Sequence, residues 1–287
     1  MELEQKYFGM LAFSVMGVLV CYEWLTGKYK DGKKTTKDWQ MFGLSAAGIQ
    51  LIERPLMMYC VYLLLDSVLP AQRESWGWIS EQYLALSVVV FILIDEFLHG
   101  FAHNFTHSRK PKNRWLARLQ AFYLGAHRPH HMNGGRDGKG EISASHVTVA
   151  GWGWMFMLPN YWFGMACLYF GLVETWFIGT AIKSIWGIHV HTNWNYDLYL
   201  LNHPNRFISK TMYGLCHIFT FPNQHHQHHS RSGNSTKNLN NFLALYDWLF
   251  WKKLVIANER PKVYGWIQRK KEADSALYRY LHRSLKI

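Results

Sequence analysis

The sequence predicts an all-α fold, a polytopic membrane bundle of four to five helices with a cytosolic helical cap that is rich in histidine. Three observations lead to this prediction. Long apolar runs recur along the 287 residues, and several are long enough to cross a bilayer as helices. The mean hydropathy of −0.14 is low for a chain that lies wholly in a membrane, so much of it is expected outside the hydrocarbon. Of the 16 histidines, all but His282 lie between His99 and His229.

The membrane segments are predicted from their apolar runs, and the chain is expected to form a single domain over residues 1–287. Residues 8–25 carry one charge and show no small-residue cleavage pattern, so they are expected to stay as an anchor. The run 41–70 is interrupted by Glu53, Arg54 and Pro55, which favour a bent or half-inserted helix. A shorter run and a hairpin of two segments complete the set: residues 78–98, 152–170 and 173–189.

Basic loops predict that the cap lies on the cytoplasmic side. The stretch "GKYKDGKKTTK" contains five lysines, and short loops rich in Lys and Arg stay in the cytoplasm. Counting crossings from this loop puts both parts of the cap, residues 99–150 and 190–287, on that side. The net charge of +12 favours an anionic partner, and the apolar runs favour a membrane surface over nucleic acid.

One group of histidines continues directly from an apolar helix. In "IDEFLHGFAHNFTH", Asp95, His99, His103 and His107 recur at every fourth residue. Residues at this spacing form one stripe along an α-helix. The stripe therefore predicts a row of imidazoles at the end of a membrane segment.

Two further motifs, "HRPHH" and "PNQHHQHH", each set three histidines at positions i, i+3 and i+4 of a helical turn. Proline is tolerated in the first turn of a helix, so helices that begin near Arg128 and Pro222 keep each set on one face. His226 points about 100° away from its neighbours and is expected outside the set. The members are His127, His130 and His131 in the first motif, and His225, His228 and His229 in the second.

The stripe and the two motifs together favour a metal site. A single pair of histidines on a membrane helix is more often explained by packing at the interface. Three imidazoles on one face, however, repel one another when protonated and are stabilised by a shared cation. Eight to ten nitrogen ligands exceed the roughly four to six that one zinc or iron ion takes, so two metals are implied. Neutral imidazole suits iron, zinc, copper and nickel, so the ligand type leaves the metal open.

The order of these motifs resembles that of a known family. The chain carries "HNFTH", "HRPHH", "HTN" and "PNQHHQHHS", followed by "NNFLALYDWLF". This series, which covers residues 95–251, resembles the fatty acid hydroxylase and sterol desaturase superfamily of integral membrane di-iron oxygenases. Three departures are visible: Tyr246 stands where the family usually has Trp, the interval from His191 to His225 is long, and His99 precedes the first pair.

The resemblance implies a set of metal ligands in this chain. It adds His191, followed by Asn193, to the histidines of the stripe and the two motifs, and it suggests His189 as a further ligand on an extended turn. The implied ligands are His103, His107, His127, His130, His131, His189, His191, His225, His228 and His229. The implied cofactors are two Fe ions, with O2 as co-substrate, and Zn can replace iron in an isolated preparation.

Other residues are expected to support the ligands. A ligating imidazole usually donates its second N–H to a carboxylate or a carbonyl, and Asp95 on the stripe is the first candidate for that role. His99, Asn193 and Asp247 are further candidates for a metal ligand or for a group that orients one. The remaining histidines of the cap are expected to be structural: His146, His203 and His217.

The resemblance implies an enzyme that hydroxylates or desaturates a C–H bond of a lipid or another hydrophobic substrate in the membrane. The dimetal site itself would be the catalytic group, with no separate catalytic side chain. The chain has no haem, flavin or iron–sulfur motif, so electrons are expected from an external donor, a ferredoxin or a b-type cytochrome with its reductase. No nucleic acid partner is expected, because no soluble basic module is evident.

The alternative function is that of a membrane metal-binding protein or metal transporter. A transporter is expected to place polar ligands inside its apolar spans, near the middle of the bilayer. In this sequence the histidines lie just past the ends of the apolar runs, which instead hold Glu53, Arg54, Glu174 and Lys183. The sequence therefore favours the oxygenase.

Overall fold

The computed structural model describes residues 14–15, 17–22, 25, 35–132, 139–268 and 270–281. Within these ranges the chain is helical and contains no β-strand, as predicted, apart from an isolated bridge between Ser230 and Tyr264. The predicted segment 8–25 and the lysine-rich loop that follows it lie largely outside the described residues. The short helices are η2 (Pro70–Gln72), η3 (Arg128–His131), η4 (Ala144–Thr148), α7 (Trp154–Met157), α10 (Tyr196–Leu201), η5 (Gly233–Thr236), α13 (Leu245–Leu249), α14 (Lys270–Asp274) and α15 (Ala276–Leu281).

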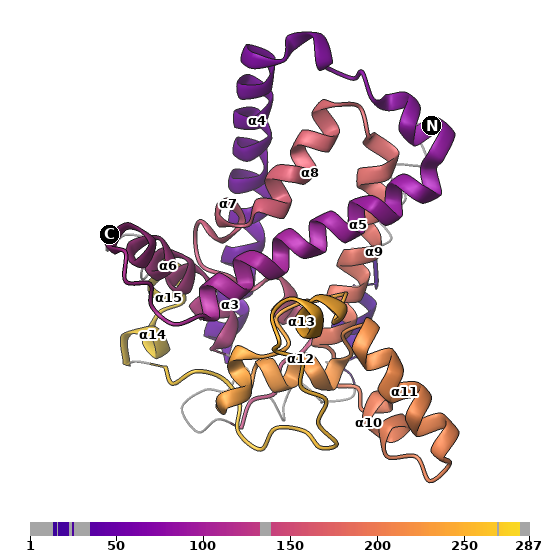
Figure 1. Cartoon of the computed structure of the whole chain (residues 1–287). Helices are drawn as coiled ribbons and strands as arrows, with labels where there is room; N and C mark the ends of the chain where they lie inside the picture. The colour runs from indigo at the N-terminus through magenta and orange to yellow at the C-terminus, as the bar shows by residue number, and fades with distance from the viewer. Residues whose placement is uncertain are drawn as a thin grey trace.

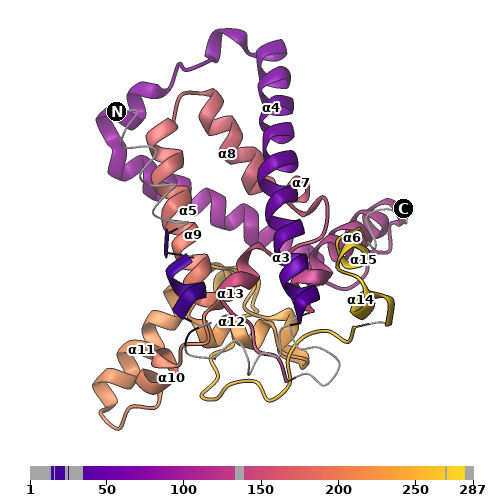
Figure 2. The same ribbon diagram turned by 180° about the vertical axis from the view of Figure 1, so that it is seen from behind.

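The predicted segment 41–70 forms one continuous helical rod (Figure 2). It consists of α3 (Thr36–Gly48), the π-helical turn η1 (Ile49–Glu53) and α4 (Arg54–Val68). Pro55 lacks an N–H and cannot donate the usual helical hydrogen bond. The π-helical turn before it accommodates the proline, so the helix continues. Glu53 is fully buried and accepts hydrogen bonds from the backbone N–H groups of Gly153 (3.1 Å) and Met155 (3.2 Å). The charged residue that interrupts the apolar run, Glu53, therefore makes a buried polar contact with the start of α7.

The predicted segment 78–98 begins a longer helix, α5 (Gly77–His107), which is kinked at Tyr83, where φ is −130° and ψ is 38°. The helix continues through the whole histidine stripe and ends at His107, where the backbone of Ser108 becomes extended. One helix therefore joins an apolar segment to the first histidines of the site. Figure 1 shows α5 crossing obliquely in front of the upright helices.

The predicted hairpin 152–170 and 173–189 forms α7, α8 (Pro159–Tyr169) and α9 (Val173–His191). Leu158 is extended because it precedes Pro159, so the first predicted segment is split into α7 and α8. Gly171, with φ of 87°, makes the turn between α8 and α9, and a Cβ there would lie 3.0 Å from Cα of Glu74. Only glycine fits this turn without strain.

The apolar core lies where α5, α8 and α9 meet. Phe91 of α5 stacks on Phe163 of α8 with ring centroids 5.5 Å apart, and Cys167 lies in the same cluster. The most extensive packing of any two elements is that of α5 against α9, and α4 packs mainly on α8. Below this core, α11 (Arg206–Ile218) and α12 (Pro222–His228) complete the lower part of the molecule (Figure 1).

Two helices of the described part of the chain are long and apolar enough to cross a membrane, Thr36–Val68 and Gly77–His107. In the most apolar 18-residue stretch of each helix, only 22% and 33% of the residues are buried. Most of these side chains therefore face outward rather than into a core. The helices α8 and α9 do not meet the same criteria of length and composition. The predicted count of four to five membrane helices therefore stays a prediction.

Candidate metal centre

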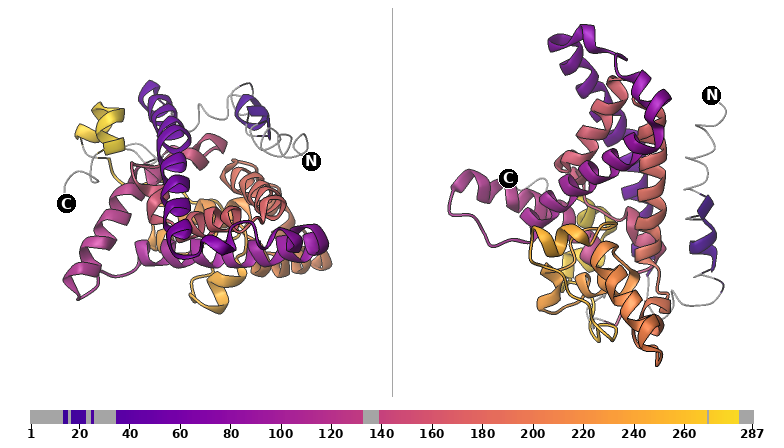
Figure 3. Two further views of the ribbon diagram at one scale, coloured as in Figure 1. Left: turned by 90° about the horizontal axis from the view of Figure 1, so that it is seen from above. Right: turned by 45° about the vertical axis from the view of Figure 1, so that its right-hand side comes forward.

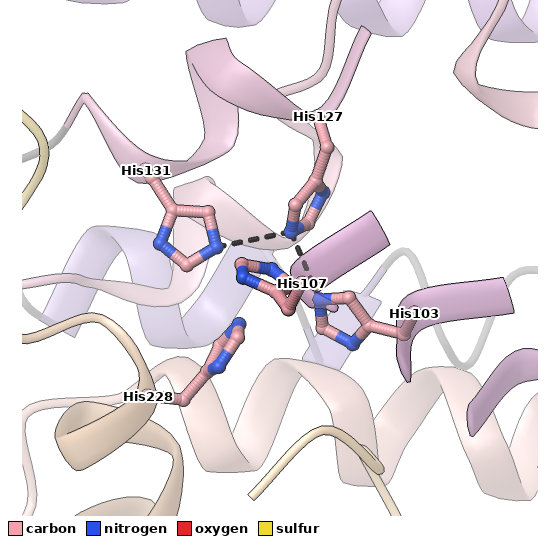
Figure 4. Close-up of side chains that lie close together, drawn as sticks. All are labelled: His103, His107, His127, His131 and His228. Atoms are coloured by element: carbon pink, nitrogen blue, oxygen red, sulfur yellow. Dashed lines mark hydrogen bonds between the residues drawn. The ribbon is translucent and has the colours of Figure 1, made fainter. Parts of the chain in front are cut away.

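Two histidines of the stripe, His103 and His107, converge with those of the two motifs and with His191. They form two adjacent groups, and in each group the candidate ligand atoms all lie within 4.8 Å of one another. Group 1, drawn in Figure 4, contains His103, His107, His127, His131 and His228. Group 2 contains His130, His191, His225 and His229.

Each three-histidine motif is divided between the two groups. From "HRPHH", His127 and His131 enter group 1, whereas His130 enters group 2. The second motif shows the reverse division. His228 enters group 1, whereas His225 and His229 enter group 2. The two motifs therefore interlock, and His131 and His229 stack with ring centroids 4.6 Å apart at the boundary. The prediction that all three histidines of a motif face the same site was therefore wrong, because each motif supplies both groups.

The local folds explain how the motifs are presented. Pro222 begins α12, as predicted, and His229 follows its last residue. The first motif differs from the prediction: His127 is the last residue of α6 (Arg114–His127), and the other two histidines lie on the 3₁₀-helix η3. The tighter 3₁₀ turn separates His130 from its neighbours, which helps to direct it towards group 2.

Backbone carbonyls fix the tautomers of several imidazoles. The Nδ1 atoms of His103 and His228 lie 2.5 Å and 3.0 Å from the carbonyl oxygens of Leu239 and Lys237. A carbonyl only accepts hydrogen bonds, so each Nδ1 carries the proton and each Nε2 keeps its lone pair. The lone pair of His103 faces Nε2 of His127 at 2.9 Å. In Figure 4 the rings of group 1 point towards one another, and Nε2 of His228 has no hydrogen-bond partner in the protein.

Group 2 shows the same arrangement and provides a test of whether a cation fits. Nδ1 of His191 donates to the carbonyl of Gly187 (2.6 Å), and Nδ1 of His130 contacts the carbonyls of His146 and Val149, both at 3.1 Å. The two Nε2 atoms, both without protons, face each other at 3.4 Å. Two lone pairs in this geometry repel, and a cation bound by both removes the repulsion. Group 2 therefore fits a metal ion, and the five imidazoles of group 1 could hold another.

Burial keeps these imidazoles neutral. It lowers the pKa of His130 to about 4. Burial first, and then the neighbouring imidazoles, lower the pKa of His131 and His229 well below the ordinary value of 6.5. Neutral rings at physiological pH are the form that binds metals.

Two tryptophans stack on imidazoles of group 1. Trp154 stacks on His127 at 4.3 Å between ring centroids, and Trp266 stacks on His131 at 4.4 Å. The backbone N–H of Trp266 donates to the carbonyl of His131, and that of Gly265 donates to the carbonyl of His229. The segment around Trp266 therefore holds both motifs. Sequence reasoning missed its role, because no motif or spacing marks it.

Several predicted residues lie outside both groups. His189 and His191 are two residues apart on α9, not on an extended turn, so their rings point about 200° apart. Nε2 of His189 lies 2.5 Å from the hydroxyl of Tyr196. The ring of His99 lies 5.5 Å from that of His103, and Nε2 of His99 has no partner in the protein. The structure does not bring His189 or His99 into either group.

Asp95 does not orient a ligand as expected. Its carboxylate forms an ion pair with Lys183 of α9 and accepts a hydrogen bond from Asn160 (3.2 Å). Lys183 also pairs with Glu96 at 2.8 Å. Lys183 of α9 therefore bridges the two acidic side chains of α5.

Asp247 supports the site through the backbone. Its two carboxylate oxygens accept hydrogen bonds from the N–H groups of Leu239 (2.9 Å) and Asn240 (3.0 Å), and the carbonyl of Leu239 accepts from His103. Asn193 is buried, and its Oδ1 has no hydrogen-bond partner in the protein. Thus Asp247 reaches group 1 through one backbone segment. The role of Asn193 as a ligand or as an orienting group stays a prediction.

The remaining predicted histidines take structural positions. His226 is buried outside both groups, with Nδ1 at 2.9 Å from the hydroxyl of Tyr264 and Nε2 at 2.9 Å from the carbonyl of Thr192. His146 caps η4, and His203 and His217 lie half-exposed on the α10–α11 region.

Comparison with known proteins adds no relative. No family model, curated protein or solved structure matches this chain.

Proposed function

We propose that this chain is a membrane-bound, O2-dependent di-iron oxygenase of the fatty acid hydroxylase and sterol desaturase superfamily. It hydroxylates or desaturates a C–H bond of a lipid or another hydrophobic substrate. The observation that carries the proposal is the pair of adjacent all-imidazole groups, at the end of a helix long and apolar enough to cross a membrane. A site of this kind suits two metal ions and an apolar substrate that arrives from the bilayer.

The ligand count supports two ions rather than one. Group 1 offers five imidazoles and group 2 offers four, and each number suits a single first-row metal. When bound, two iron ions would supply the activation of O2 and the attack on an unactivated C–H bond. The order of the histidine motifs is the reason for choosing iron over zinc, copper or nickel.

The chain's own residues position the ligands and exclude water. Carbonyls such as those of Leu239 and Gly187 hold the imidazoles in the tautomer that leaves Nε2 free. Trp154 and Trp266 cover two rings of group 1, so this side of the site is shielded from water. A dry site favours oxidation of the substrate over unproductive reduction of O2.

The proposal includes a topology and partners. Segments 152–170 and 173–189 would lie in the membrane beside the two long helices, with the site on the cytoplasmic side. Electrons would come from an acidic ferredoxin or a b-type cytochrome with its reductase, attracted by a chain with 31 Lys and Arg against 19 Asp and Glu.

A direct experiment separates this function from metal transport. The full chain is purified from cells supplied with iron, and metal content and substrate-dependent O2 consumption are measured with a reducing system. Lipids from cells that express the chain are compared by mass spectrometry with lipids from cells that express His228→Ala or the control His203→Ala, a residue outside both groups. The oxygenase predicts tightly bound iron and a product that has gained one oxygen or lost two hydrogens, except with His228→Ala. Exchangeable metal, with no O2 uptake and no change in lipids, would favour the transporter.

A further inference from the structure

The first turns of α6 combine exposed apolar side chains with a concentration of positive charge. Trp115 is 70% exposed, Leu116 is 47% exposed and Leu119 is 42% exposed. Residues 109–118 include five Lys or Arg, all of them exposed, and residues 97–136 contain no Asp or Glu. Apolar residues beside unneutralised basic residues are typical of a helix that lies in the headgroup layer of an anionic membrane.

The two kinds of side chain are segregated around the helix. At about 100° per residue, Trp115, Leu116 and Leu119 fall within an arc of about 100°, whereas Arg114 and Arg118 lie together on its flank. The guanidinium carbons of Arg114 and Arg118 lie 5.9 Å and 5.3 Å from the ring centre of Trp115. The arginines therefore border the apolar arc, where their charges can reach phosphates while the arc enters the acyl-chain boundary.

The position of α6 agrees with such a role. Figure 1 shows it beside the lower end of α5, below α8 and above α12. In both views of Figure 3 it projects outward from the bundle instead of running with the upright helices. The helix α6 therefore lies where α5, one of the two candidate spans, ends. Gln120, about 40° beyond Leu116 at one edge of the arc, is buried and donates hydrogen bonds to the carbonyls of Phe105 (2.8 Å) and Ser108 (2.9 Å), which anchors this edge of the helix to the end of α5.

We propose that α6 is an interfacial helix that binds the headgroup layer of an anionic bilayer, with Trp115, Leu116 and Leu119 inserted and Arg114 and Arg118 on the phosphates. Because α6 ends at His127, the lipid surface would fix the depth of one ligand of group 1. The proposal does not depend on the metal or on the reaction.

The test measures the depth of two labels on α6. In a Cys21→Ala/Cys60→Ala background, where the remaining cysteines are buried, a fluorophore is attached at Leu119→Cys or at Ala121→Cys. Ala121 is also exposed but lies about 160° around the helix from Leu119, so it is a matched control. The full chain is placed in nanodiscs of phosphatidylcholine with or without phosphatidylserine. Quenching is measured with a lipid that carries a nitroxide at the top of its acyl chain and with aqueous iodide.

The proposal predicts at least twofold stronger nitroxide quenching at Leu119 than at Ala121, and the reverse order with iodide. Phosphatidylserine should strengthen the nitroxide quenching at Leu119, and Arg114→Gln/Arg118→Gln should remove that increase. The charge-matched control Arg206→Gln/Lys210→Gln, on exposed positions of α11, should keep it. Equal iodide quenching at both labels would overturn the proposal, because it would show that the apolar arc of α6 is exposed to water, as expected if the arc binds a protein partner instead of lipid. An equal effect of both double substitutions, or no effect of phosphatidylserine, would overturn the anionic headgroups as its ligand.

Discussion

At the scale of single residues, histidines of the same motif belong to different groups. His131 and His191 belong to different groups, although both are nearly fully buried. Nothing in the spacing of "HRPHH" distinguishes His130 from His131, because both lie on the helical face that the motif predicts. The division follows from the 3₁₀ turn and from the carbonyls that orient the rings, which are tertiary features.

Single substitutions should therefore remove one metal at a time. His131→Ala should lower the bound metal from two equivalents to about one, and His191→Ala should do the same from the other group. Metal content of the purified full chain, measured by mass spectrometry, checks this outcome, with His217→Ala as a control outside both groups. Loss of both metals from each single variant, in a folded protein, would mean that the groups do not bind independently.

Asp247 provides a second prediction at this scale. Asn in its place accepts hydrogen bonds with only one oxygen, so one of the N–H groups of Leu239 and Asn240 loses its acceptor. Asp247→Asn should lower the free energy of unfolding by about 1–3 kcal/mol. It should also weaken metal binding at group 1 by about 10- to 100-fold, because the carbonyl that orients His103 moves.

Metal titration and thermal unfolding check this prediction. The matched control is Asp274→Asn, at an exposed position of α14, which should change neither quantity. Unchanged metal affinity in Asp247→Asn would show that this carboxylate serves the fold alone.

At the scale of elements, the position of the site depends on a close approach of α5 to the segment 239–243. A Cβ at Gly100 would lie 2.4 Å from Oδ1 of Asn240. Asn240 donates to the carbonyl of Glu96 at 3.0 Å, and Glu96 accepts from the N–H of Phe242 at 2.7 Å. These contacts tie α5, which carries the stripe histidines, to the segment 239–243.

Gly100→Ala should separate these elements. It should cost about 1–3 kcal/mol through overpacking, in spite of the higher helix propensity of Ala. Gly214→Ala on α11, where an added Cβ meets nothing within 4 Å, should instead be neutral or stabilising. Thermal unfolding of both variants checks the contrast, and equal stability of the two would show that the contact between Gly100 and Asn240 is not tight in solution.

Helix periodicity predicted the elements that carry histidines better than those that lie in the apolar part. The stripe from His99 to His107 lies on α5, and Pro222 begins α12, because both predictions depend on local backbone rules. The split of 152–170 at Pro159 and the continuous rod through Pro55 could not be predicted from composition. Pro159 interrupts its helix, whereas Pro55 does not. Before Pro55 the chain forms a π-helical turn, and this turn is stabilised by the buried hydrogen bonds of Glu53.

At the scale of the whole molecule, the fold concentrates neutral imidazoles in a buried centre. Sequence spacing identified eight of the nine grouped histidines, and the ninth, His191, came from the family resemblance. The contributions of Trp154, Trp266 and the carbonyls could not be predicted, because they depend on segments that meet only in the folded chain.

This concentration predicts a dependence of stability on pH. The pKa of His130 falls from 6.5 to about 4 on burial, so between these values the unfolded chain binds more protons than the folded one. Stability is therefore complete above pH 6.5 and falls as the pH drops through this window. The midpoint of thermal unfolding of the full chain in detergent should be lower at pH 5 than at pH 8, with or without metal. A midpoint that is unchanged or higher at pH 5 would contradict the burial of neutral imidazoles.

The most direct test of the central claim is an anomalous scattering map, recorded at the iron edge, from crystals of the full chain loaded with iron. The account predicts two peaks, one within bonding distance of Nε2 of His228 and the other histidines of group 1, the second within bonding distance of His191 and the rest of group 2. A single peak, or peaks remote from these rings, would contradict it.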